Sequence, residues 1–271
     1  MIDYEAEYNN RAMVPEHPDI IAGWAKDAAA YREGSACELD CAYGLGPRMQ
    51  YDLFLPTGGA DARMIALFLH GGYWQALDRK HFSHMARGLN AQGYTVCVAG
   101  YDLCPEVRIS DIVVEIRDLA AHLWERFRKP ILAYGHSAGG HLTAALLATD
   151  WRKRHLPPGL ANAGMAVSGL FDLLPLIRTG VNDAVRMDQK EAIANSPIAM
   201  GIPYGARLIA SVGELESSEY KRQSRVIVDF WSRGGIDAKL RVEEGANHFT
   251  VIAPLADPDS GMIHDLAQLG R

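Results

Sequence analysis

Short apolar runs, separated by longer stretches with helical spacing, dominate the pattern of this chain. Continuous apolar runs predict strands buried on both faces, whereas apolar residues at every third or fourth position predict helices. The predicted strands cover residues 49–55, 64–69, 94–99, 131–134, 164–167, 208–212 and 238–242. The predicted helices cover residues 81–91, 109–127, 138–148 and 218–232, and two short helices are expected after residue 248.

The order of these elements indicates the fold class. Strands that alternate with helices are typical of an α/β fold, in which helices cover both faces of a mainly parallel sheet. No linker or repeat divides the chain, so residues 1–271 are predicted to form a single domain. Residues 171–203 are expected to be irregular and partly helical, and residues 57–61 to form a turn.

The first 35 residues are more polar than the rest of the chain. Their few apolar positions have a spacing that predicts one or two amphipathic helices on the surface, where they could form a partial cap. These positions are Ile20, Ile21, Trp24, Ala28 and Tyr31.

Composition supports a globular core and limits the partners. The chain has 271 residues, of which 48% are hydrophobic and 22% charged, enough for a sizeable core. The net charge is −6 and the basic residues are scattered, so no nucleic-acid partner is expected. No apolar run approaches the roughly 20 residues that span a bilayer, and no signal peptide is visible. We therefore expect a cytoplasmic protein with a small-molecule substrate; a homodimer stays open.

The cysteines and histidines do not indicate a metal site. Cys37 and Cys41 lack a partner pair or a nearby histidine, so free thiols are expected for them and for Cys97 and Cys104. The histidines lack the spacing of H-E-x-x-H. Gly139-Gly140 is not followed by the lysine of a phosphate-binding loop. No metal and no cofactor are predicted.

The strongest chemical signal is the pentapeptide Gly135-His136-Ser137-Ala138-Gly139. It follows a predicted strand and precedes a predicted helix, the context in which a G-x-S-x-G turn exposes a nucleophilic serine. The alternative is an ordinary glycine-rich turn. The context favours Ser137 as the nucleophile of a serine hydrolase.

A serine nucleophile needs a base and an acid that orients the base. His248 follows the last predicted strand, where the order serine, acid, histidine places the base. The acid should follow the preceding strand, where Glu216 is our choice and Glu214 is the rival. For either glutamate, the alternative is a capping role at the next helix.

Acyl transfer also needs hydrogen-bond donors for the developing oxyanion. The segment His70-Gly71-Gly72-Tyr73-Trp74 directly follows a predicted strand. Its glycines allow a close approach of the backbone, so the N–H groups of Gly71 and Gly72, with that of Ala138, are the candidate donors. The alternative is a plain turn at the end of the strand.

The segments HGGYW and GHSAGGH and the spacing of the acid loop resemble the kynurenine formamidase (arylformamidase) branch of the α/β-hydrolases, close to the hormone-sensitive-lipase-like esterases. The segment YDLCPE is similar to their Y-R-L-A-P-E, with Asp102 and Cys104 as departures. The resemblance implies an α/β-hydrolase fold with Ser137 as nucleophile, His248 as base and Glu216 as acid, where formamidases usually have aspartate. The segment Tyr8-Asn9-Asn10-Arg11-Ala12 has no counterpart in that branch that we can place.

Together these residues predict a cofactor-independent serine hydrolase that acts on a small acyl compound, with an aryl formamide of the N-formylkynurenine type as the favoured substrate. Tyr73, Trp74 and Phe171 are candidate pocket walls, with core packing as the alternative for each. Three other functions stay open. They are a short-chain carboxylesterase, a carbon–carbon or other specialised hydrolase, and a non-catalytic binding protein on the same fold.

Overall fold

The computed structural model describes residues 2–56, 59 and 62–271. Within these residues an eight-stranded sheet has the order β1-β2-β4-β3-β5-β6-β7-β8. β2 pairs antiparallel with β1 and β4, and all other neighbours are parallel, which confirms the predicted mainly parallel sheet. The strands are β1 (Cys37–Ala42), β2 (Gln50–Phe54), β3 (Ile65–Leu69), β4 (Val96–Ala99), β5 (Ile131–His136), β6 (Ala161–Val167), β7 (Arg207–Gly213) and β8 (Asp237–Glu243).

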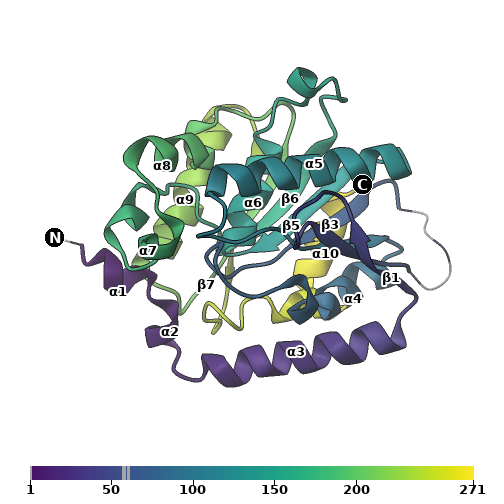
Figure 1. Cartoon of the computed structure of the whole chain (residues 1–271), viewed down its shortest axis with the longest axis horizontal. Coiled ribbons are helices and arrows are strands. Elements are labelled where there is room, and N and C mark those ends of the chain that lie inside the picture. The colour runs from purple at the N-terminus through teal and green to yellow at the C-terminus, as the bar shows by residue number, and fades with distance from the viewer. Residues whose placement is uncertain (1, 57–58, 60–61) are drawn as a thin grey trace.

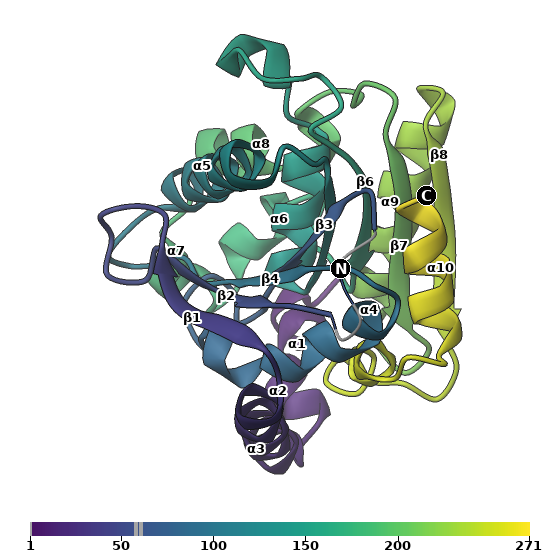
Figure 2. The same ribbon diagram turned by 90° about the vertical axis from the view of Figure 1, so that its right-hand side faces the viewer.

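Helices cover both faces of this sheet (Figure 1). α5, α6 and α9 lie on one face, and α3, α4 and α10 on the other, while β1 and β8 form opposite edges (Figure 2). No helix in the described part of the chain is long and apolar enough to cross a bilayer. The helices are α1 (Tyr4–Tyr8), α2 (Asn10–Met13), α3 (His17–Gly34), α4 (Arg87–Ala91), α5 (Ile109–Phe127), α6 (Ala138–Leu147), α7 (Asn182–Val185), α8 (Gln189–Asn195), α9 (Ser218–Arg233) and α10 (Gly261–Leu269).

The apolar run of β3 shows why its strand is central. Successive side chains of a strand point to opposite faces of the sheet. Leu67 and Leu69 accordingly join the hydrophobic cluster beneath α5 and α6, whereas Ala66 and Phe68 join the cluster beneath α3, α4 and α10. A strand covered by helices on both faces needs apolar residues at every position, which is what this segment supplies.

The structure departs from the sequence prediction at two places. β1 is not predicted, because this edge strand is mostly exposed and carries polar residues without a clear alternation. The predicted helix 81–91 consists of the 3₁₀ turns Arg79–His81 and Ser83–Ala86 followed by α4. Apolar spacing alone does not separate short 3₁₀ turns from an α-helix. Of the predicted turn at 57–61, only Gly59 lies within the described residues.

The parallel strands all end at one edge, and the candidate residues follow those ends. Gly71 comes after β3, Ser137 after β5, Glu216 after β7 and His248 after β8. In open parallel sheets, ligands bind at this carboxyl edge. The fold therefore brings together residues that are widely separated in the sequence.

We predict that Gly139→Ala lowers the free energy of unfolding by about 1–3 kcal/mol or more. A Cβ at Gly139 would overlap the backbone carbonyl of Leu69, which cannot move without distorting β3. Gly23→Ala is the matched control, because a Cβ there meets nothing within 4 Å and alanine favours the α3 helix by about 0.5–1 kcal/mol. Urea unfolding of both variants measures the difference. Equal midpoints for Gly139→Ala and the wild type would contradict the steric argument.

Candidate active site

Ser137 occupies a sharp turn between β5 and α6. Its backbone has φ 56° and ψ −116°, a conformation that L-residues other than glycine rarely adopt. Two hydrogen bonds hold it there. The Ser137 N–H donates to the Val167 carbonyl at 2.8 Å, and the Ser137 carbonyl accepts from the His141 N–H at 3.0 Å. The strained turn thus fixes the serine at the start of α6, as a nucleophile turn requires.

Glu216 and His248 form a buried hydrogen-bonded pair. His248 Nδ1 lies 2.7 Å from Glu216 Oε2. The other carboxylate oxygen, Oε1, accepts from the Gly213 N–H at 2.7 Å and from the Ser168 hydroxyl. Glu214, by contrast, is exposed and accepts from the Gly245 N–H. The structure therefore brings Glu216, and not Glu214, to His248.

His136 holds the loop that carries His248. Its Nε2 lies 2.8 Å from the His248 carbonyl, which can only accept, so Nε2 carries the proton. The centroids of the two rings are 4.7 Å apart. Burial lowers the pKa of His136 well below its ordinary value, and the neighbouring His248 adds to this effect. His136 is thus a neutral support and adds no positive charge beside His248.

The loop after β3 offers backbone donors next to Ser137. A Cβ placed on Gly71 would lie 3.2 Å from the Ser137 Cβ, so the two backbones nearly touch. Gly72, Tyr73 and Trp74 have φ values of 114°, 49° and 56°, which form one left-handed turn. The N–H groups of Gly72 and Tyr73, like that of Ala138, have no hydrogen-bond acceptor within the described residues. They are therefore available to a ligand at this position.

His70 stabilises the same loop from the core. Its Nδ1 lies 2.7 Å from the Gly71 carbonyl, and its ring stacks on Tyr101 with centroids 4.3 Å apart. The Tyr101 hydroxyl in turn donates to the His70 carbonyl at 2.8 Å. Burial lowers the pKa of His70 to about 4, so the ring is neutral and Nδ1 donates to Gly71.

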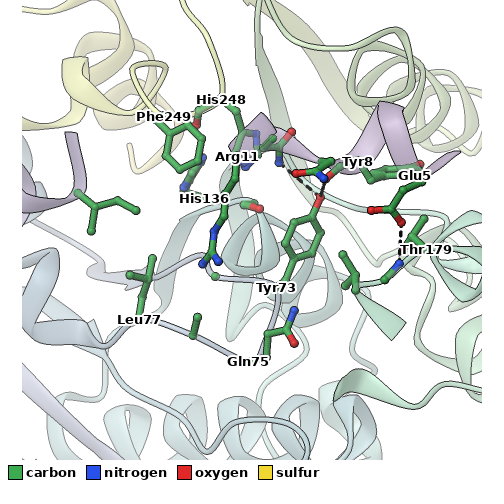
Figure 3. A pocket seen from close by; sticks show the side chains of 18 of the residues that line it. Glu5, Tyr8, Arg11, Tyr73, Gln75, Leu77, His136, Thr179, His248 and Phe249 are labelled. Carbon is green, nitrogen blue, oxygen red and sulfur yellow. Dashed lines mark hydrogen bonds between the residues drawn. The ribbon is translucent and has the colours of Figure 1, made fainter. Parts of the chain in front are cut away.

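A pocket of about 430 Å³ has Ser137 in its lining. Figure 3 shows this pocket from close by. Four parts of the chain form it: the N-terminal segment before and within α3, the loop after β3, the residues at and after the ends of β5 and β8, and residues 179–181 between β6 and β7. Its lining includes Ser137, His136 and His248, together with Tyr73. From the N-terminal segment come Glu5, Tyr8, Asn9, Asn10, Arg11, Ile21 and Trp24.

The interpretation of Trp74 and Phe171 as pocket walls is wrong. Neither side chain lines the pocket, and both are fully buried in the core. Trp74 Nε1 donates to His141 Nδ1 at 3.2 Å, and burial lowers the pKa of His141 to about 4, which keeps this nitrogen free to accept. Phe171 packs with Leu208 and Ile227 in the cluster under α9. Core packing, the alternative for these two residues, is what the structure shows.

A protein-family model described as alpha/beta hydrolase fold matches residues 66–218, more than half of the chain. The chain belongs to the α/β-hydrolase fold family. This confirms the predicted fold class, and the match places the protein among enzymes that act as hydrolases.

Relatives of this hydrolase include two fish kynurenine formamidases. The one from Salmo salar is 31% identical over 233 residues, 82% of this chain and 78% of the relative. The one from Danio rerio is 27% identical over 226 residues, 81% of this chain and 77% of the relative. They confirm the resemblance drawn from the sequence motifs.

Solved structures show the same fold. A Silicibacter sp. tm1040 protein, provisionally assigned as a thioesterase, is 35% identical, with a TM-score of 0.88 over 97% of this chain and 98% of that one. An esterase of the bacterial hormone-sensitive lipase family is 21% identical, with a TM-score of 0.67 over 94% and 96% of the two chains. At this identity, the likeness to the esterase shows a common fold and nothing more.

The N-terminal segment of the hydrolase is attached through buried polar groups that the sequence did not single out. The Tyr73 hydroxyl donates to the Tyr8 carbonyl at 2.7 Å and lies 2.7 Å from the Tyr220 hydroxyl. Because the one proton of Tyr73 goes to a carbonyl, Tyr220 donates in the bond between the two hydroxyls. Asn10 Nδ2 donates to the Tyr220 oxygen at 2.9 Å. The Tyr220 ring also faces His248, with centroids 4.6 Å apart.

A second set of bonds holds the segment on α9. The Tyr8 hydroxyl donates to Glu219 Oε2 at 2.8 Å and accepts from Gln223 Nε2 at 2.8 Å. Burial is the main cause that raises the pKa of Tyr8; the hydrogen bond from Gln223 opposes it, and the Glu219 carboxylate adds to it. The hydroxyl therefore stays protonated and can donate to the carboxylate. In sequence terms, the unmatched motif Tyr8-Asn9-Asn10-Arg11 was the one available signal of this attachment.

We predict that Tyr8→Phe lowers the free energy of unfolding by about 1–3 kcal/mol, because Glu219 and Gln223 each lose a buried partner. Tyr4→Phe is the matched control. Tyr4 lies in the same helix and stacks on Tyr8, but its hydroxyl has no partner within the described part of the chain. Its substitution should change stability by no more than about 0.5 kcal/mol. Urea unfolding tests both, and equal effects of the two variants would refute a specific role for the Tyr8 hydroxyl.

Proposed function

We propose that this hydrolase cleaves an aryl formamide of the N-formylkynurenine type through a formyl-enzyme intermediate on Ser137. The observation that carries the chemistry is the buried hydrogen bond between His248 and Glu216, in loops that meet at the Ser137 turn. The kynurenine formamidase relatives, which match about four-fifths of the chain, support the formamide as substrate.

In the first step, Ser137 Oγ attacks the formyl carbon while its proton passes to His248 Nε2. The carbonyl oxygen becomes negative, and the N–H groups of Ala138 and of the Gly71–Gly72 loop stabilise it, joined by the N–H of Tyr73. The C–N bond then breaks. His248 returns the proton to the departing aryl amine, which leaves a formyl ester on Ser137.

In the second step, water attacks the formyl ester and His248 accepts the proton of that water. Formate leaves, and the proton returns to Ser137 Oγ. Each step uses protein groups and water alone, so the proposal requires no metal or cofactor. A cytoplasmic location is also part of the proposal, supported by the four free cysteines, which suit a reducing compartment.

Glu216 orients His248 and stabilises its positive form during both steps. A glutamate serves where formamidases usually have aspartate because its carboxylate is fixed by the Gly213 N–H and the Ser168 hydroxyl as well as by His248. Those two donors compensate for the additional rotatable bond of the longer side chain.

We predict that Glu216→Gln lowers kcat by about 10²–10⁴-fold, because the imidazolium loses its charged partner. Ser137→Ala sets the inactive baseline. Glu214→Gln makes the same carboxylate-to-amide change at an exposed position and should retain activity close to the wild type. Steady-state kinetics with one substrate compares the three variants. If Glu214→Gln were the crippling change and Glu216→Gln the mild one, the assignment of the acid would be wrong.

A short-chain ester or thioester is the second candidate substrate. The provisionally assigned thioesterase from Silicibacter sp. supports it, because it is 35% identical and matches nearly the whole chain. The proposed chemistry at Ser137 is the same, but the leaving group is then an alcohol or a thiol and not an aryl amine. A substrate comparison separates the two candidates.

Tyr73 should restrict the acyl group to a small size. It lines the pocket beside the proposed oxyanion donors, and its hydroxyl is held by Tyr8 and Tyr220, so the ring cannot easily turn away. We predict high kcat/KM for N-formylkynurenine and measurable activity on p-nitrophenyl acetate. We predict poor activity on p-nitrophenyl palmitate, since each methylene that does not fit costs about 1–3 kcal/mol. Preference for the palmitate would refute the short acyl site, and activity on acetate but on no aryl formamide would favour the ester candidate.

A further inference from the structure

The N-terminal segment places one arginine in the pocket that contains Ser137 (Figure 3). We propose that Arg11 binds a carboxylate of the substrate, so that the enzyme selects acyl compounds whose far end carries an acid group. This inference rests on the proposed function for the reacting bond. It concerns the other end of the substrate, about which Ser137, His248 and Glu216 carry no information.

The backbone of Arg11 is fixed by its neighbours. Tyr8 and Asn10 are buried and bonded to α9 and to the loop after β3. The Asn9 side chain accepts from the Ala12 N–H at 3.1 Å and so caps the short helix α2, in which Arg11 is the second residue. Arg11 therefore projects from a rigid base, and a rigid base reduces the entropy lost when a side chain binds a ligand.

The Arg11 guanidinium has no carboxylate within 4.0 Å among the described residues. Glu5 is the one acidic residue of this lining within the described residues, and its carboxylate accepts a hydrogen bond from the Gly180 N–H at 2.7 Å. An arginine presents its donors in a planar fork that matches a carboxylate with two parallel hydrogen bonds. Its charge is unpaired in the part of the chain that the structure describes, so an anionic ligand would supply the missing partner.

The rest of the lining favours an aryl group in the ligand. Apolar side chains form much of the wall, namely Ile21, Trp24, Leu77, Val181 and Phe249. His136 is neutral, as shown above. A ligand that combines a reactive acyl group, an apolar ring and a carboxylate matches the side chains of this lining.

The test compares two aryl formamides that differ at the far end. N-Formylkynurenine carries the amino-acid group, and 2′-formamidoacetophenone is the same aryl ketone without it. Arg11→Gln should lower kcat/KM for N-formylkynurenine by about 10- to 50-fold, mainly through KM, and leave 2′-formamidoacetophenone nearly unchanged. Arg11→Lys should recover part of the loss, because it keeps the charge and loses the fork.

Arg178→Gln is the matched control. Arg178 is exposed and next to Thr179, which lines the pocket, but it does not line the pocket itself. A screened surface charge of this kind should change kcat/KM by less than about threefold. Equal losses on both formamides in Arg11→Gln would indicate a structural role, and no loss on either would remove Arg11 from recognition; each result would overturn the proposal.

A binding measurement separates this proposal from the formamidase assignment. Kynurenine and 2′-aminoacetophenone are compared as competitive inhibitors of p-nitrophenyl acetate hydrolysis, which does not require formamide cleavage. We expect kynurenine to inhibit the wild type more strongly and to lose this advantage in Arg11→Gln. That result would support Arg11 even if no formamide were cleaved. Equal inhibition of the wild type by the two compounds would refute the carboxylate site whatever the natural reaction.

Discussion

The positive φ of Ser137 is the constraint on which the rest of the site depends. A serine holds this backbone conformation only when its surroundings compensate for the strain. Here the Val167 carbonyl of β6 binds the Ser137 N–H, and the first turn of α6 binds its carbonyl. Gly139 lets that helix approach the end of β3 so closely that no side chain would fit between them. The packing of strands and helix thus determines where the hydroxyl stands, and the other loops are arranged around it.

The N-terminal segment brings residues from the start of the chain to a pocket that otherwise consists of later parts of the chain. Tyr8 and Asn10 are bonded to α9 residues more than 200 positions away in the sequence. These bonds are buried, so breaking one of them leaves a polar group without a partner. The segment is therefore part of the pocket wall and not a loose covering. It contributes pocket-lining residues that the carboxyl edge of the sheet does not contain.

Sequence reasoning located residues that the structure brings together where the prediction used their place after a strand. Ser137, Glu216 and His248 were selected by position, and the structure brings the last two within hydrogen-bonding distance in loops beside the first. Sequence reasoning was less accurate where the burial of a side chain decides whether it faces the pocket or the core. An aromatic residue after a strand can face a pocket or the core, and Trp74 faces the core, where His141 accepts a hydrogen bond from its indole N–H. β1 was not predicted because a polar edge strand lacks an apolar pattern. The hydrogen bonds of Tyr8 to α9 were not predicted because the partners are distant in the sequence.

Three of the histidines described above have lost the property for which histidine is usually chosen. His70, His136 and His141 are buried, and burial shifts the pKa of each downward, so that each keeps a fixed tautomer and serves as a rigid bracket. The proposed mechanism therefore transfers protons through one imidazole, that of His248. The sequence alone offers four histidines as candidate acid–base groups of the site, namely His70, His136, His141 and His248. In the proposed mechanism one ring, that of His248, transfers protons, and the other three are neutral supports.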